Sequence, residues 1–152
     1  MHGGSKRSVL LFLFICCWGL RADAKQLAVI VGKSNAVTAV STADLSKIFT
    51  LDSRKWPDGN GVILVIMDPS LPEMQNAIQK IFKMGSDEFK IWMASHQRAV
   101  MVAKTDAELL TAVDTVPGAI GLIDVYSITN RIKVVKIDGK LPLEAGYLLR
   151  GN

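Results

Sequence analysis

Three continuous apolar runs constrain the fold of this chain more than any other feature. They are rich in β-branched residues and span residues 26–31, 62–67 and 119–123. Runs of this length and composition are typical of strands buried on both faces, as in a sheet that is covered by helices. The chain is therefore expected to build a layered structure in which helices pack on a sheet.

Amphipathic segments separate these runs. One begins at Ser41, whose hydroxyl can cap a helix, and continues with apolar residues at helical spacing through Phe49. A second capping pattern joins Thr105 and Glu108, and the helix that it opens would end before Pro117. Both segments have the spacing of short helices that bury one face.

The stretch after the second apolar run predicts two more helices. Ser70 and Glu73 have the spacing of a capping box, with Pro72 in the first turn. The helix that they open would end at Gly85, because glycine readily leaves the helical conformation. Residues 86–93 then predict a further short helix.

The order of these elements indicates the fold class. Residues 132–137 alternate in polarity as an edge strand does, and residues 52–61 form a polar loop around one tryptophan. Residues 142–152 carry no pattern that predicts an element. The alternation of strands and helices predicts an α/β fold: one lobe-sized domain with helices packed on a mixed, partly parallel sheet.

The first 24 residues have the features of a cleavable secretory signal peptide. Lys6 and Arg7 form a basic start, an uncharged apolar run covers residues 8–20, and Ala22 and Ala24 stand where signal peptidase needs small side chains. The run is too short for a typical spanning helix, although an uncleaved anchor remains the alternative. We therefore expect a mature domain of residues 25–152, located in the periplasm.

Cleavage would change the chemistry available to the protein. Cys16 and Cys17 both lie in the signal segment, so the mature domain would have no disulfide, thiolate metal site or cysteine nucleophile. The formal net charge would fall from +4 to +2, because the segment holds three basic residues and one acidic residue. A charge so near neutrality gives no reason to expect binding to nucleic acid or to a membrane surface.

The mature chain lacks the residue sets of common enzymes. His96 would be its one histidine, which is too few for a zinc site, and no G-x-S-x-G turn accompanies it. Gly59 and Gly61 flank a turn without the lysine of a phosphate loop. The chain is therefore predicted to be non-enzymatic and to need no cofactor or metal. A hydrolase that uses two carboxylates is the alternative, and it would require convergence of loop acids such as Asp52, Asp58 and Asp68.

Polar residues at the strand ends are the remaining candidates for a site. Ser34 and Asn35 follow the first apolar run, with Lys33 beside them, and Ser70 follows the second. Open α/β sheets bind ligands beyond the carboxyl ends of their strands, and hydroxyl-capped helix starts attract oxyanions. These four residues are thus the predicted ligands of a small anion, with Ser70 first. The alternative is a plain cap or a solvated charge, which also applies to Arg54, Lys55 and Lys104.

Three motifs follow one another along the chain: L-x-x-I-F at 45–49, W-P-D-G at 56–59 and V-P-G-A-I-G at 116–121. In this order they resemble the phosphate-type periplasmic solute-binding proteins of ABC transporters, in particular their short single-domain relatives. The resemblance extends from about residue 26 to residue 136. It implies a periplasmic-binding-protein fold, an oxyanion such as phosphate as ligand, and an ABC transporter or envelope sensor as partner. Full-length members have two lobes, and this chain has the length of one.

One stretch departs from that family. The resemblance implies a Ser-Gly-Thr-type turn after the second strand that holds phosphate, and only Ser70 matches it. Leu71 replaces the glycine, Pro72 removes an amide donor, and Glu73 adds a negative charge. Two hypotheses follow. In the first, the chain is a solute-binding module for phosphate or another small oxyanion. In the second, it is an interaction module of the cell envelope that has lost the anion site and forms, for example, a homodimer.

Overall fold

The computed structural model describes residues 25–151, so the predicted signal peptide lies outside the described residues. The elements in chain order are β1 (Leu27–Gly32), β2 (Ala39–Val40), α1 (Thr42–Phe49), β3 (Ile63–Ile66), α2 (Pro72–Ala77), the π-helical turn η1 (Ile78–Phe82), α3 (Ser86–Ser95), β4 (Val100–Val102), α4 (Asp106–Thr115), β5 (Ala119–Asp124), the 3₁₀ turn η2 (Val125–Ser127), β6 (Ile132–Val134) and β7 (Lys136–Ile137). Within this range no helix is long and apolar enough to cross a membrane.

The main sheet has five strands in the order β4-β3-β5-β1-β6. β3 runs parallel to β4 and β5, whereas β1 runs antiparallel to both of its neighbours, β5 and β6. The sheet is therefore mixed, as predicted. We name its two ends after β3: the carboxyl end, where β3, β4 and β5 finish, and the amino end, where β1 finishes. β2 and β7 form a separate parallel pair.

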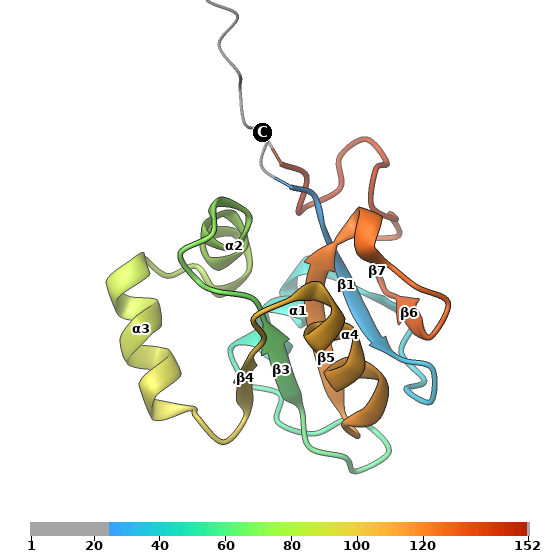
Figure 1. The fold of residues 1–152 in the computed structure, drawn as a ribbon, viewed down its shortest axis with the longest axis horizontal. Coiled ribbons are helices and arrows are strands. Elements are labelled where there is room, and N and C mark those ends of the chain that lie inside the picture. Colours follow the sequence, from blue (N-terminus) through green and yellow to red (C-terminus); the bar gives the residue numbers. More distant parts are fainter. Residues whose placement is uncertain (1–24, 152) are drawn as a thin grey trace, which may run out of the picture.

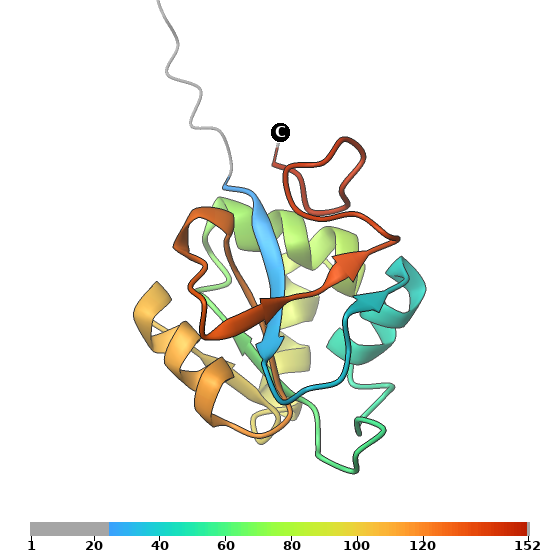
Figure 2. The ribbon, with the colours of Figure 1, turned by 90° about the vertical axis from the view of Figure 1, so that its right-hand side faces the viewer.

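Helices cover both faces of the sheet. α4 lies over one face, and α1 lies on the opposite side with α2 and α3 next to it (Figure 1). The view turned by 90° shows β1 between α4 and α1 (Figure 2). The layered α/β architecture that the apolar runs predict is confirmed.

The side chains of β1 alternate between two cores. Ile30 belongs to the smaller core, which includes Leu109 and Val113 of α4. Its neighbour Val29 belongs to the larger core on the other face, together with Phe49 of α1. Because both faces are covered, every position of β1 except its last is buried, which explains the unbroken apolar run.

A glycine in β5 allows α4 to lie close to the sheet. A Cβ atom on Gly121 would lie 2.9 Å from Cγ2 of Val113 and 3.1 Å from Cδ2 of Leu109. Real Cβ atoms do not approach other side chains so closely in a well-packed core. The final glycine of V-P-G-A-I-G is therefore a packing requirement.

Both predicted helix caps outside the 70–85 stretch are confirmed. The hydroxyl of Ser41 accepts a hydrogen bond from the backbone N–H of Asp44 over 3.0 Å at the start of α1. The hydroxyl of Thr105 accepts one from the N–H of Glu108 over 3.1 Å at the start of α4. Each bond satisfies an amide that the helix itself leaves free.

The helix predicted through Met74, Ile78, Ile81 and Phe82 is present, but its cap and its stop are not the predicted Ser70 and Gly85. α2 begins at Pro72 and passes into the wider turn η1, and the chain leaves it at Lys83, which is left-handed with φ 55°. The wider turn places Phe82 in the core, where its ring centroid lies 4.7 Å from that of Phe89. Gly85 instead precedes α3 as its cap residue.

The sequence did not predict β4 or the burial of the last residues. β4 is a short edge strand on which Met101 and Val102 are 42% and 49% exposed. Tyr147 and Leu149 enter the larger core and are nearly inaccessible to solvent. The edge strand predicted at 132–137 is present, but it divides between β6 in the main sheet and β7, which pairs with β2.

Candidate functional site

Ser70, the first predicted ligand residue, lies in the loop between β3 and α2. Its backbone N–H and its hydroxyl both donate to Oδ1 of Asp68, each over 2.8 Å. The prediction that Ser70 caps a helix is therefore wrong. α2 has Leu71 as its cap residue, and no side chain caps it. The turn at Asp68 forms in place of a helix cap at Ser70, because one carboxylate oxygen satisfies both donors of the serine.

The same hydrogen bonds stabilise the ionised form of Asp68. They hold the pKa of Asp68 below its usual value, with the backbone bond contributing most and the hydroxyl bond next. The carboxylate is therefore ionised in neutral solution and occupies the two donors that an oxyanion would use. A second anion at this place would also be repelled. Ser70 can bind an oxyanion only after the carboxylate of Asp68 has moved away.

Ser70 lines a cavity of about 630 Å³ at the carboxyl end of the sheet, between the β3–α2 loop and α3. We call it the carboxyl-end pocket. Its size is that of a small-molecule site. The lining combines a carboxylate, hydroxyls, amides and one ammonium group with apolar side chains; its members are Asp68, Pro69, Ser70, Gln75, Ser86, Phe89, Lys90, Met93, Ala94 and Gln97.

A chain of hydrogen bonds fixes one wall of this pocket. The hydroxyl of Ser86 donates to Oε1 of Gln75 over 2.6 Å, and Nε2 of Gln75 donates to the carbonyl oxygen of Pro69 over 2.5 Å. The bonds tie the start of α3 to α2 and to the loop after β3. Lys90, one turn further along α3, forms no ion pair with any residue of 25–151. The pocket thus offers one positive charge to a small polar solute, while the hydroxyl donors of Ser70 and Ser86 are taken up by Asp68 and Gln75.

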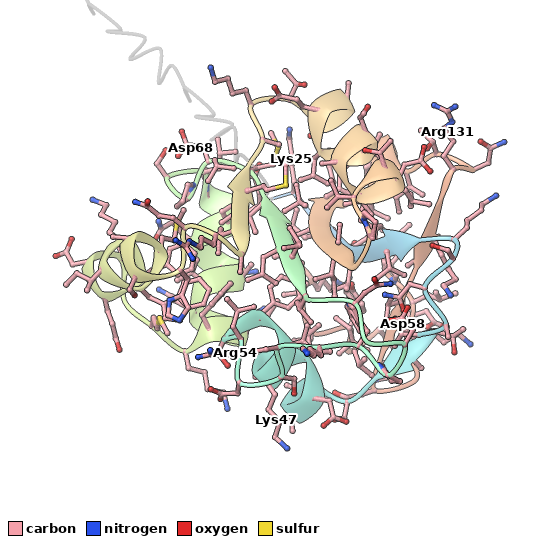
Figure 3. All side chains as sticks on the ribbon, turned by 90° about the horizontal axis from the view of Figure 1, so that it is seen from below. Lys25, Lys47, Arg54, Asp58, Asp68 and Arg131 are labelled. Atoms are coloured by element: carbon pink, nitrogen blue, oxygen red, sulfur yellow. The ribbon has the colours of Figure 1, made fainter. Side chains whose placement is uncertain are left out.

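The structure does not bring the other predicted residues to this pocket. Ser34 and Asn35 follow β1, which runs opposite to β3, so they lie at the amino end of the sheet. They line a separate cavity of about 110 Å³ together with Asp58 and Asp114, whose carboxylates make it a poor place for an anion. Figure 3 shows Asp58 on the far side of the molecule from Asp68.

The local contacts of this turn are structural. Oδ1 of Asn35 accepts a hydrogen bond from the N–H of Val37 over 2.9 Å, and the N–H of Asn35 donates to the carbonyl oxygen of Gly32 over 3.0 Å. Lys33 is exposed. Of the four predicted ligand residues, Ser70 alone lies at the carboxyl end, and the predicted set does not form one site.

Two of the motifs that carry the resemblance contact each other. Nε1 of Trp56 donates to the carbonyl oxygen of Gly118 over 2.8 Å. Gly118 is left-handed, with φ 79°, and a Cβ atom there would lie 2.0 Å from the carbonyl oxygen of Gly61. W-P-D-G and V-P-G-A-I-G are therefore framework that fixes the loop before β3 against the turn before β5.

His96, the residue that follows α3, has structural surroundings. Its Nδ1 lies 2.7 Å from the carbonyl oxygen of Trp92, and its ring stacks on the indole with centroids 4.5 Å apart. Because a carbonyl oxygen only accepts, Nδ1 carries the hydrogen. Across residues 25–151 no group of three or more His, Cys, Asp or Glu side chains is placed to hold a metal ion.

Sequence reasoning missed most of the polar lining of the carboxyl-end pocket. Ser86 and Lys90 stand four residues apart in a segment that was predicted as a helix, so the sequence could place them on one helical face. It could not show that this face lies beside the loop after β3. That neighbourhood depends on the packing of α3, which no local pattern encodes.

No family model matches the chain, and none of the curated proteins compared with it matches. Solved structures do. PstS from Borrelia burgdorferi has a TM-score of 0.67 at 18% identity, over 84% of this chain and 55% of that one. An ABC-type phosphate transport receptor from Vibrio cholerae has a TM-score of 0.61 at 16% identity, over 84% and 54%. The phosphate-binding protein of Stenotrophomonas maltophilia has a TM-score of 0.64 at 16% identity, over 79% and 41%.

The chain spans about half the length of these proteins. Since fewer than one residue in five is identical, the likeness concerns the backbone architecture. It agrees with the element order that the sequence predicts. The chain therefore has the α/β fold of phosphate-type periplasmic solute-binding proteins.

Proposed function

We propose that the chain is a non-enzymatic solute-binding module of the periplasm that takes a small oxyanion, phosphate in the first place, for an ABC transporter or an envelope sensor. One observation carries the proposal: the carboxyl-end pocket lies where open α/β sheets bind ligands, in a fold whose solved examples include phosphate transport receptors. The predicted signal segment is consistent with this location.

The residues of the pocket divide into groups that favour an oxyanion and one that opposes it. Lys90 supplies a positive charge, and the hydroxyls of Ser70 and Ser86 become donors for a ligand once they leave Asp68 and Gln75. Asp68 opposes binding, because its carboxylate holds both donors of Ser70. Phosphate would bind by displacing this carboxylate from Ser70, so we expect weaker binding than an open turn of amides would give.

Thermal melting of the purified protein at low ionic strength tests the proposal, with millimolar phosphate and with sulfate as comparison. A ligand at a hundred times its Kd adds roughly 2.7 kcal/mol to the free energy of unfolding, which is several degrees for a domain of this size. We expect a rise with phosphate that exceeds the rise with sulfate. Equal rises, or none, would contradict selective phosphate binding.

Two serine variants locate the binding site. Ser70→Ala removes a hydroxyl of the carboxyl-end pocket and should abolish the phosphate-dependent rise. Ser34→Ala is the matched substitution at the amino end of the sheet and should leave the rise unchanged. The opposite pattern would move the site to the small cavity that Ser34 lines.

A second candidate function is an interaction or dimerisation module of the cell envelope that has lost the anion site. The hydrogen bonds from Ser70 to Asp68 favour it, because they fill the place of the ligand with a protein group. The exposed apolar side chains of the edge strand β4, Met101 and Val102, favour it too. Light scattering after size exclusion separates the two functions: a stable dimer without any phosphate response supports this one.

A further inference from the structure

A second cavity, of about 470 Å³, opens at the amino end of the sheet. It lies beside the residues that lead into β3 and β4, the turn after α3 and the loop after α1. We call it the arginine pocket; its lining consists of Leu51, Arg54, Val62, Ala94, Ser95, His96, Gln97, Arg98 and Ala99. Ala94 and Gln97 also line the carboxyl-end pocket, so the end of α3 separates the two cavities.

The charges of the arginine pocket have one sign. Arg54 and Arg98 both line it, and no carboxylate does. Within residues 25–151 the ion pairs are formed by other side chains, and neither of these arginines takes part in one. Two guanidinium groups at one cavity repel each other, and an anion bound between them would remove that repulsion.

The backbone around Arg54 presents its side chain to the cavity mouth. Leu51 is left-handed, with φ 62°, a conformation that costs free energy for a residue with a Cβ atom. Its buried side chain holds it there, and its carbonyl oxygen accepts a hydrogen bond from Nε of Arg54 over 3.3 Å. The carbonyl oxygen of Arg54 in turn accepts from the N–H of Val62 over 2.9 Å. Figure 3 shows Arg54 on the side of this loop that faces α3.

Arg98 is fixed through its neighbours in the turn between α3 and β4. The N–H of Ala99 donates to the carbonyl oxygen of His96 over 3.0 Å, and the carbonyl oxygen of Ala99 accepts from the N–H of Leu64 in β3 over 2.8 Å. The turn is thus anchored to the sheet. The guanidinium of Arg98 makes no hydrogen bond with the other residues that the structure describes, so all of its donors are available.

The rest of the lining indicates what kind of anion fits. Leu51 and Val62 are buried apolar side chains at the cavity, and Ala94 and Ala99 add methyl groups. The volume exceeds what a bare inorganic ion fills and falls in the range of small-molecule sites. Guanidinium groups bind phosphate and carboxylate groups through paired hydrogen bonds.

We propose that Arg54 and Arg98 form an anion-binding site for a small organic phosphate or carboxylate whose apolar part lies against Leu51 and Val62. This site is separate from the carboxyl-end pocket, and its ligand is held by charge-assisted hydrogen bonds from the two guanidinium groups. It does not depend on Ser70 or on phosphate binding there.

Calorimetric titration of the purified protein at low ionic strength tests this site with three probes: phenyl phosphate, benzoate and inorganic phosphate. We expect phenyl phosphate or benzoate to bind more tightly than inorganic phosphate, because only the organic probes contact the apolar wall. The better of the two identifies the anionic group. Absence of binding for both organic probes overturns the site, and equal affinity for inorganic phosphate overturns its organic specificity.

Variants assign the binding to these residues. Arg54→Gln and Arg98→Gln should each weaken the organic probe by about tenfold or more, as loss of a charge-assisted hydrogen bond does. Arg150→Gln removes a distant exposed charge, and Ser70→Ala alters the other pocket; both should leave the affinity unchanged. Arg98→Gln is the decisive variant, since its side chain holds no part of the fold. Equal losses in Arg98→Gln and Arg150→Gln would show binding to net charge and overturn the site.

Discussion

At the scale of single residues, Asp68 opposes the binding of an anion in the carboxyl-end pocket. One oxygen of its carboxylate accepts two hydrogen bonds from Ser70, and these bonds hold its pKa low. The negative charge therefore stays in place throughout the neutral range. Whether Ser70 can bind an anion therefore depends on its hydrogen bonds to Asp68, and the presence of a serine alone does not decide it.

The variant Asp68→Ala should bind phosphate more tightly than the unaltered protein. It removes a negative charge and frees the N–H and the hydroxyl of Ser70, so both donors can turn to the ligand. We expect a gain of at least tenfold in affinity by calorimetric titration. The double variant with Ser70→Ala should lose the gain; if the gain persists there, the freed donors are not its cause.

Asp138 gives a pH dependence to the stability of the fold. Its carboxylate accepts hydrogen bonds from the hydroxyl and from the backbone N–H of Thr42, the latter over 2.9 Å, and these bonds lower its pKa. Since the pKa is lower in the folded than in the unfolded chain, this contribution is present above the usual pKa of aspartate. It is lost as the pH falls through the folded value.

Urea unfolding between about pH 5 and pH 2 checks this contribution. Asp138→Asn should be less stable than the unaltered protein at neutral pH, and the difference should shrink toward the acid end. Asp52→Asn, in an exposed loop, is the matched variant and should show no such convergence. A constant difference for Asp138→Asn across the range would count against the hydrogen bonds to Thr42 as the cause.

At the scale of elements, the packing of α4 on β5 depends on the absence of a side chain at Gly121. A Cβ atom there would meet Val113 and Leu109 of α4 and, at 3.2 Å, the carbonyl oxygen of Val65. The backbone oxygen cannot move aside as the end of a flexible side chain could. A methyl group at residue 121 therefore requires α4 to shift outward, and it also presses on the carbonyl oxygen of Val65 in β3, which a shift of α4 does not relieve.

Gly121→Ala should destabilise the protein by about 1–3 kcal/mol, the usual cost of overpacking a core. Urea unfolding measures this loss, and circular dichroism should show the fold retained. Gly61→Ala is the matched control, because a Cβ atom at Gly61 would meet nothing within 4 Å. Similar losses in both variants would point to backbone entropy as the cause in place of the contact with α4.

The elements also show what the sequence could and could not predict. The strands β1, β3 and β5 could be predicted from their unbroken apolar runs, because helices cover both faces of the sheet and every position but one in each of these strands is buried. The caps at Ser41 and Thr105 were predicted because a hydroxyl and an amide three residues apart interact locally. β4 escaped prediction because a three-residue strand with two exposed side chains has no periodicity to detect.

The candidate site was predicted less well, because the sequence does not show in which direction each strand runs. An apolar run indicates a strand but not which way the strand runs in the sheet. Ser34 and Ser70 each follow such a run, yet β1 and β3 are oppositely directed, so the two serines lie at opposite ends. The turn at Asp68 is local, but the spacing of Ser70 and Glu73 also fits a capping box, and sequence alone does not show which of the two forms.

At the scale of the whole molecule, the final residues close the larger core. Tyr147 and Leu149 are 3% and 1% exposed, although no periodic pattern marks this segment. The hydroxyl of Tyr147 is buried without a hydrogen-bond partner, and burial raises its pKa far above the usual range. The backbone of Val29 lowers this pKa again, but by less than burial raises it.

Tyr147→Phe should leave the stability unchanged or raise it by about 1 kcal/mol, because the ring keeps its packing while an unsatisfied polar group is removed. Tyr147→Ala should cost about 3–5 kcal/mol through the cavity that it creates. Urea unfolding measures both. A clear loss in the phenylalanine variant would reveal a partner for the hydroxyl, such as a bound water.

The hydrogen bonds from Ser70 to Asp68 make this carboxylate a tethered competitor for any oxyanion that uses the same donors. Its effective concentration is set by two intervening backbone links and does not fall when the protein is diluted. The fraction of these donors bound to an external anion then depends on the concentration of that anion relative to the constant effective concentration of the Asp68 carboxylate. An oxyanion therefore gains these donors only where its concentration is high enough to displace the tethered carboxylate.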